Sequence, residues 1–256
     1  MTRPTHGMQQ WQGKTALVTG ASSGIGAAVA TRLLADGMRV VGCGRRQDRV
    51  AKILAAADPS GASSLALTCD VTDEAAVKAM FAAAQARFGG VDVLVNNAGL
   101  GHAGTLATGH VADWREMLEV NVIGLCLCTR EALADMRGRG GFGQIIHISS
   151  MAGQRVPPGA GFYGATKHAV RALTESLRIE LREAGDPIRI GEISPGYVET
   201  GFAEHYYKSA EKARETYERF QVLEPVNIAE AVISMLACPP HVQVHDILLR
   251  PTEQPT

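Results

Sequence analysis

The chain has 256 residues, of which 46% are hydrophobic and 20% charged, as in ordinary soluble globular proteins. Its 25 Lys and Arg residues balance 26 Asp and Glu residues, so no basic excess favours nucleic-acid binding. No apolar run is long enough to span a bilayer, and the first 14 residues lack the apolar segment of a signal peptide. These features predict a cytoplasmic protein that binds neither nucleic acid nor membrane.

Five cysteines are scattered along the chain. They are too few for a disulfide framework, and the one close pair, Cys126 and Cys128, does not have the usual zinc spacing. We therefore expect free thiols, a reducing compartment and no metal site.

Strand-like and helix-like segments alternate along the chain. The predicted strands are short apolar runs at 14–20, 38–44, 64–69, 91–95, 144–149, 188–193 and 244–249. Helical spacing of apolar residues predicts helices at 25–35, 48–57, 73–88, 113–136 and 162–184, and two further helical stretches precede the last strand. Strands separated by helices need crossover connections, which indicates an α/β fold with a parallel sheet between two helical layers. No linker divides the chain, so we expect a single domain over 1–256.

A glycine-rich loop joins the first predicted strand to the first predicted helix. Glycines let the backbone turn sharply and approach a pyrophosphate, and the helix N-terminus offers free N–H groups. The alternative is a tight turn without a ligand, but the position after the first strand favours a dinucleotide site. The loop residues expected to bind the cofactor are Gly20, Ser22, Ser23, Gly24, Ile25 and Gly26.

The end of the second predicted strand bears on the choice of dinucleotide. An acidic residue there would bind the ribose hydroxyls of NAD, but this strand ends at Gly44 and is followed by Arg45 and Arg46. Guanidinium groups fit a 2′-phosphate in charge and geometry. We therefore expect NADP rather than NAD, although one of the two arginines is expected to be solvated.

Tyr163 and Lys167 are four residues apart in a predicted helix, so both side chains lie on one helix face. A nearby ammonium should lower the pKa of the Tyr163 hydroxyl and make it an acid or base for an alcohol–ketone pair. Ser150 follows a strand, where ligands of such sheets bind, although it can also be a helix cap. Asn121 interrupts an apolar run and needs polar partners, which leaves structural and relay roles open.

Together these motifs resemble the short-chain dehydrogenase/reductase family over nearly the full length of the chain. The resemblance rests on 19–26, 96–99, Asn121, Ser150, 163–167 and 195–200, in family order. It implies a doubly wound Rossmann fold with seven parallel strands in the order 3-2-1-4-5-6-7. It also implies a homodimer or homotetramer joined by the helices that contain Asn121 and Tyr163.

The resemblance also implies a role for each catalytic residue. Tyr163 is the proton donor or acceptor, and Lys167 binds the nicotinamide ribose and lowers the pKa of the tyrosine. Ser150 orients the substrate carbonyl, and Asn121 holds a water that passes protons outward from Lys167. The other implied cofactor contacts are Asp70 and Val71 beside the adenine, Val198 and Thr200 at the carboxamide, and Asn97, Ala98, Gly99, Pro195 and Gly196 along the crevice.

A narrower resemblance rests on 151–157, 162–167 and 250–254. These segments are similar to a subgroup that includes the mammalian 17β/3-ketosteroid reductase called dehydrogenase/reductase family member 11, with insect farnesol dehydrogenases and bacterial 3-hydroxy acid reductases nearby. The likeness supports NADP more than it defines a substrate.

Aromatic residues make up only 5% of the chain, yet six ring side chains gather between 199 and 222. They are Phe202, His205, Tyr206, Tyr207, Tyr217 and Phe220. An apolar lid over a lipophilic carbonyl is one interpretation, and packing at a subunit interface is the other. His102 and His110 follow the fourth strand and are weaker candidates for substrate contacts.

The sequence thus predicts an NADP-dependent oxidoreductase for a carbonyl or secondary alcohol, with a ketosteroid or another lipophilic carbonyl as the favoured substrate. A 3-hydroxy acid or small-carbonyl enzyme is the first alternative. A cofactor-binding sensor without turnover is the second, and the intact Ser150, Tyr163 and Lys167 set argues against it.

Overall fold

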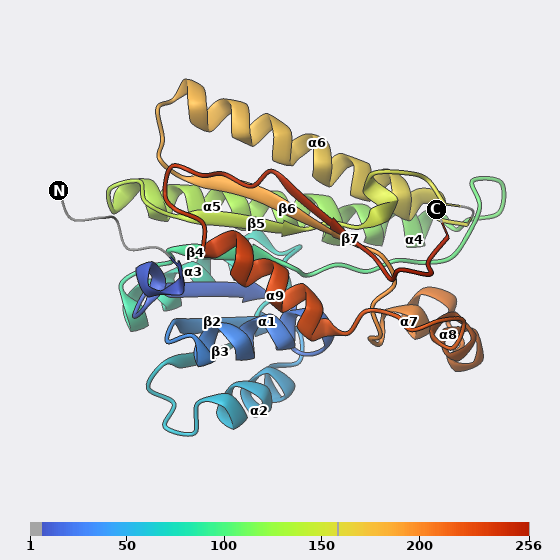
Figure 1. The fold of residues 1–256 in the computed structure, drawn as a ribbon, viewed down its shortest axis with the longest axis horizontal. Coiled ribbons are helices and arrows are strands. Elements are labelled where there is room, and N and C mark those ends of the chain that lie inside the picture. Colours follow the sequence, from blue (N-terminus) through green and yellow to red (C-terminus); the bar gives the residue numbers. More distant parts are fainter. Residues whose placement is uncertain (1–6, 158, 256) are drawn as a thin grey trace.

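A seven-stranded parallel sheet runs through the middle of the computed structural model, with strands in the order β3-β2-β1-β4-β5-β6-β7 (Figure 1). The predicted α/β class and strand order are confirmed. The structure describes residues 7–157 and 159–255. Residues 1–6, at the start of the N-terminal segment that was predicted to lack a signal peptide, lie outside the described residues, as do 158 and 256. The strands are β1 Thr15–Thr19, β2 Arg39–Gly44, β3 Ser64–Thr68, β4 Val93–Asn96, β5 Gln144–Ile148, β6 Arg189–Pro195 and β7 Asp246–Leu249.

Helices cover both faces of this sheet. The α-helices are α1 Gly24–Ala35, α2 Gln47–Ala57, α3 Glu74–Phe88, α4 Val111–Leu118, α5 Leu125–Gly138, α6 Gly161–Glu183, α7 Phe202–Tyr207, α8 Ala210–Tyr217 and α9 Pro225–Leu236. Shorter helical turns are η1 Gly7–Trp11, η2 Glu119–Gly124 and η3 Met151–Gly153. Three helices, rather than the two expected, therefore lie between β6 and β7.

Two hydrophobic cores form because successive residues of a strand face opposite sides of the sheet. In β1, Val18 packs with α1, α2 and α9, whereas Leu17 packs with α3, α5 and α6. Both side chains are fully buried. Burial on both faces explains why the strands read as continuous apolar runs rather than as an alternating pattern.

The long helix predicted over 113–136 is interrupted. A π-helical stretch, η2, separates α4 from α5 and contains the buried Asn121. The Asn121 side chain bonds both backbone groups of Leu100, at 2.9 Å to its N and 2.8 Å to its O. This pairing ties the wider helical turn to the segment that follows β4. Helical spacing alone does not distinguish such a stretch from regular α-helix.

The sheet has an open crevice where the direction of strand addition reverses. β1 pairs with β2 on one side and with β4 on the other, so the connections from their carboxyl ends diverge. Ligands of doubly wound sheets bind at this reversal. Helices α7 and α8 lie beyond the same end of the sheet (Figure 1). Among the described residues, no helix is both long and apolar enough to cross a membrane.

Candidate active site

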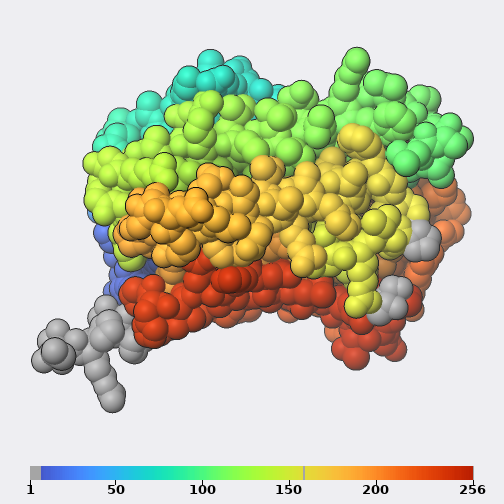
Figure 2. Space-filling view, turned by 90° about the horizontal axis from the view of Figure 1, so that it is seen from above, coloured from blue at the N-terminus to red at the C-terminus, as the bar shows by residue number. Residues whose placement is uncertain are grey.

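A cleft of about 1350 Å³ opens at the carboxyl ends of the strands. In the space-filling view, segments of the middle and the end of the chain gather at this end of the molecule (Figure 2). All of the predicted catalytic and cofactor-binding residues except Gly26 and Asn121 line the cleft: Gly20, Ser22, Ser23, Gly24, Ile25, Arg45, Arg46, Asp70, Val71, Asn97, Ala98, Gly99, Ser150, Tyr163, Lys167, Pro195, Gly196, Val198 and Thr200.

The loop between β1 and α1 has the shape that a pyrophosphate needs. Gly20 and Gly24 have φ angles of 68° and 54°, which favour glycine. A Cβ on Gly20 would lie 2.9 Å from Asn97 Nδ2, so the loop also needs glycine for its close approach to that side chain. Within the described residues, Ser23 at the N-cap makes no side-chain bond to the first turn of α1. The free N–H groups of that turn therefore fit a dinucleotide phosphate.

Thr19 and Asn97 join the ends of β1 and β4 beneath this loop. The Thr19 hydroxyl accepts from the backbone N of Asn97 at 3.0 Å and of Ala98 at 2.9 Å. In return, Asn97 Nδ2 donates to the Thr19 carbonyl at 2.9 Å. Gly26 packs directly behind, because a Cβ there would overlap Asn97 Nδ2 and the Gly20 carbonyl. Gly26 thus shapes the loop from below rather than from within the cleft.

Three arginines gather where β2 ends. Arg45, Arg46 and Arg49 all line the cleft, and all three are exposed. Within the described parts of the chain, no carboxylate forms an ion pair with any of them, which leaves their charges available to a ligand. Arg49 was missed from the sequence, although its place one turn after Arg45 and Arg46 on a predicted helix could have indicated it.

Ser150, Tyr163 and Lys167 meet on the opposite wall. Ser150 follows β5 and caps η3 by accepting from Ala152 N at 3.1 Å. Tyr163 and Lys167 lie on the first turns of α6. Lys167 Nζ donates to the Ile148 carbonyl at 3.0 Å and lies 5.8 Å from the centre of the Tyr163 ring. An ammonium carries three donors, so Lys167 can bind further hydroxyl groups.

The lowered pKa expected for Tyr163 is wrong for this structure. Burial raises the pKa of the Tyr163 hydroxyl to about 12, and the hydrogen bond with Ser150 opposes this only in part. Burial also lowers the pKa of Lys167 to about 8, against the attraction of Glu192. Desolvation disfavours both charged forms and here outweighs the opposing effects of Ser150 on Tyr163 and of Glu192 on Lys167.

Asn121 lies behind the cleft wall. Its Nδ2 donates to Thr166 Oγ1 at 3.0 Å as well as to the Leu100 carbonyl, so both amide hydrogens are used. Gly99 lines the cleft and lies against this amide, since a Cβ on Gly99 would lie 3.3 Å from Asn121 Oδ1 and 3.6 Å from Lys167 Nζ.

Two aromatic side chains of α7 pack against the ring of Tyr163. The centres of the Phe202 and Tyr206 rings lie 5.4 Å and 6.0 Å from that of Tyr163. Tyr206 fastens α7 to both sides of the cleft, because its hydroxyl donates to the Gly159 carbonyl at 2.7 Å and its carbonyl accepts from Ala103 N at 2.9 Å. The α7 part of the aromatic cluster thus lies beside Tyr163, the predicted acid or base.

The remaining rings of the cluster support the backbone around it. The Tyr217 hydroxyl donates to the Thr200 carbonyl at 2.9 Å. Phe220 packs against Tyr197, with ring centres 6.2 Å apart. Both contacts stabilise the segment after β6, which contains the predicted carboxamide contacts Val198 and Thr200.

Neither histidine candidate lines the cleft. The buried His102 bonds Glu116 through Nε2 at 2.8 Å and lies against His205, with ring centres 5.0 Å apart. His110 is exposed and precedes the first residue of α4. A substrate contact by either residue is therefore not supported; His102 instead supports the wall from behind.

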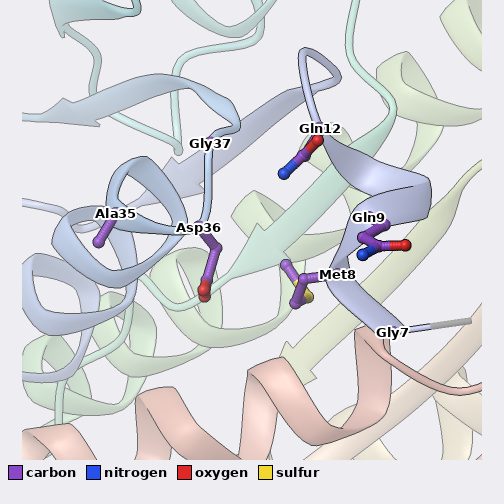
Figure 3. Close-up of a pocket in the computed structure, with 7 residues that line it drawn as sticks. All are labelled: Gly7, Met8, Gln9, Gln12, Ala35, Asp36 and Gly37. Carbon is purple, nitrogen blue, oxygen red and sulfur yellow. The ribbon is translucent and has the colours of Figure 1, made fainter.

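A second, smaller hollow of about 440 Å³ lies between η1 and the turn from α1 to β2 (Figure 3). Its lining residues are Gly7, Met8, Gln9, Gln12, Ala35, Asp36 and Gly37. It lies at the amino end of β2, opposite the edge where ligands of this architecture bind. The large cleft is therefore the candidate active site.

Comparison with known proteins agrees with this geometry. A family model described as short chain dehydrogenase matches residues 14–211. The chain belongs to the short-chain dehydrogenase/reductase family. It is therefore an NAD(P)-dependent oxidoreductase, and the family assignment from the sequence motifs is confirmed.

Three members of the short-chain dehydrogenase/reductase family show how far the likeness extends. Dehydrogenase/reductase SDR family member 11 of Bos taurus is 49% identical, over 97% of this chain and 100% of the relative. Farnesol dehydrogenase of Aedes aegypti is 44% identical, over 95% and 98%. A solved structure, the closed form of serine dehydrogenase complexed with NADP+, is 34% identical with a TM-score of 0.89, over 94% of this chain and 96% of that one.

The packing of Gly26 gives a direct test of the phosphate loop. Replacing Gly26 by Ala forces α1 away from Asn97 and Gly20, at a cost of about 1–3 kcal/mol. We expect the dissociation constant of NADPH to rise at least about tenfold, measured by fluorescence titration. Gly138→Ala is the matched control, since a Cβ there meets no atom within 4 Å among the described residues. Equal affinity in the two variants would contradict the assignment.

Proposed function

We propose that this enzyme is an NADP-dependent reductase of lipophilic ketones or aldehydes. The observation that carries the proposal is the pair of rings, Phe202 and Tyr206, which stack on each other and pack against the Tyr163 ring at the reacting end of the cleft. Rings of this kind favour contact with flat or extended apolar substrates and exclude water from the reaction. We interpret 199–222, which contains α7 and α8, as the substrate lid.

The distribution of charge in the cleft supports a neutral substrate. Of the described cations that line it, Arg45, Arg46 and Arg49 lie at the end of β2. Lys208 is 3.4 Å from Asp113 and therefore already has a carboxylate partner. Lys167 faces Tyr163 and the Ile148 carbonyl. A substrate carboxylate beside Phe202 and Tyr206 would lose its hydration without gaining a free cation, which is costly.

Tyr163 is suited to donate a proton. Because burial raises the pKa of Tyr163 to about 12, the hydroxyl is protonated at neutral pH. A bound NADPH supplies a hydride for the carbonyl carbon, and we assign Tyr163 to protonate the carbonyl oxygen and Ser150 to orient it. A tyrosine that retains its proton is in the form that a general acid needs for carbonyl reduction.

Lys167 and Asn121 support that step from behind. We assign Lys167 to binding of the nicotinamide ribose and to the electrostatic support of Tyr163. Both amide hydrogens of Asn121 already donate to protein groups. We therefore assign binding of the relay water to the backbone carbonyl of Asn121 in η2. Widened helical turns of this kind occur frequently at functional sites.

We also propose that the enzyme forms homo-oligomers through the helices that contain Asn121 and Tyr163. Exposed apolar side chains on these helices support this: Leu118, Ile123 and Ile179 are 40%, 41% and 50% exposed. Clustered apolar side chains at a surface favour association between copies. A location in the cytoplasm stays a prediction.

The substrate class is tested by NADPH oxidation against a carbonyl panel. The panel contains ketosteroids, isoprenoid aldehydes, aromatic diketones, 3-oxo acids and small aldehydes. We expect kcat/KM for the best neutral lipophilic carbonyl to exceed that for any 3-oxo acid by at least about tenfold. The reason is that the carboxylate of such an acid would find no free cation beside Phe202 and Tyr206. A preference for the acids would favour the alternative indicated by the neighbour named serine dehydrogenase and would overturn the proposal.

The choice of NADP is tested by charge reversal at the end of β2. Arg45→Glu and Arg46→Glu, singly and together, should lower the kcat/KM ratio of NADPH to NADH, by about tenfold or more for the residue that meets the 2′-phosphate. Lys52→Glu is the control, since Lys52 is exposed on α2, which directly follows the two arginines, and does not line the cleft. An unchanged ratio in the double variant would refute the assignment to these arginines.

A further inference from the structure

The end of the chain folds back onto the active-site cleft. After β7, the chain turns at Pro251, where the Gln254 N donates to the Pro251 carbonyl at 3.1 Å. This segment ends at the same end of the molecule as α7 (Figure 1). Gln254 is only 4% exposed, unusual for a polar residue so close to a chain terminus. Its side chain lines the large cleft.

The Gln254 amide joins two walls of the cleft. Its Oε1 accepts from the backbone N of Tyr197 at 2.9 Å, and its Nε2 lies 3.2 Å from Met151 Sδ. Met151 directly follows Ser150, and Tyr197 directly precedes Val198. A buried amide held on both sides fixes the groups that it contacts, since moving them would leave its polar atoms without partners.

The approach of this side chain depends on Gly196. A Cβ on Gly196 would overlap Gln254 Oε1 and would lie 2.7 Å from Arg250 Cβ. The Gly196 N also donates to the Leu249 carbonyl at 2.8 Å. The segment after β6 therefore packs against the final segment through backbone and side-chain contacts together, and glycine is required at the point of closest approach.

We infer that Gln254 is a positioning residue, which holds the Pro195–Thr200 segment against Met151 and thereby sets the substrate side of the reaction chamber. The inference rests on the proposed function, because Met151 and Tyr197 are taken as walls of the substrate pocket. The phosphate loop and the arginines after β2 make no recorded contact with Gln254 among the described residues. Gln254 should therefore affect the substrate and the nicotinamide end of the cofactor, whose predicted contacts Val198 and Thr200 lie in the same segment, but not the phosphate and adenosine end.

Three substitutions test this role. Gln254→Ala removes both contacts, and Gln254→Asn keeps the amide but shortens its reach by one methylene. Gln254→Glu keeps an oxygen that can accept from Tyr197 N. Glu253→Ala is the control, because the adjacent Glu253 is exposed.

We expect the alanine and asparagine variants to raise KM for a bulky lipophilic carbonyl by about tenfold, with a smaller change in kcat. The dissociation constant of NADPH should rise by less than KM for the carbonyl, because the phosphate loop and the arginines after β2 still hold the other end of the cofactor. Gln254→Glu should recover only part of kcat/KM relative to Gln254→Ala, because it restores an acceptor for Tyr197 N but buries a carboxylate. General destabilisation would instead weaken cofactor and substrate binding to the same extent, and that result would overturn the inference.

Hydrogen exchange gives a readout that does not depend on turnover. In Gln254→Ala, the Tyr197 amide should exchange at least about tenfold faster, since it loses its acceptor. An unchanged exchange rate would overturn the inference even if no substrate were found. Conversely, a wild-type enzyme inactive on all carbonyls, with faster exchange in the variant, would contradict the proposed function while leaving the positioning role supported.

Discussion

The bonds between Thr19 and Asn97 hold together the two strand ends between which the cleft opens. They tie β1 to β4 at the point where strand order reverses, and they need a loop with no side chain at Gly20 and none at Gly26. The phosphate loop, the crevice and the catalytic wall are all built outward from this junction. The residues of this junction have small side chains or none, so they leave room for a ligand above them.

The charge of Lys167 is balanced by a polar row that crosses four strands. Asn96, His147, Glu192 and Asp246 lie in register on β4, β5, β6 and β7. Burial, with the charge of Lys167, lowers the pKa of His147 to about 3, so the ring is neutral. Glu192 acts in the opposite direction and favours the charged lysine. Glu192 thus supports the charge of Lys167 at the cleft wall, although no carboxylate forms an ion pair with the lysine among the described residues.

The sequence predicted the sheet and most of the cleft, because both depend on local patterns. Alternating apolar segments indicated the strands, and glycine spacing indicated the phosphate loop. Features set by tertiary packing were not accessible: the π-helical stretch at Asn121, the raised pKa of Tyr163 and the burial of His102 against Glu116. Gln254 had no local signal, since only the folded chain brings the last residues to Tyr197.

The central claim is that Tyr163 supplies the proton beneath the rings of α7. The most direct measurement is a single-turnover assay of Tyr163→Phe, with NADPH and the best carbonyl of the panel at saturation. Loss of a general acid should lower the rate of NADPH oxidation by about 10²–10⁴-fold. The dissociation constant of NADPH should remain within about twofold, because the ring is kept. A variant that oxidises NADPH at the wild-type rate would contradict the account.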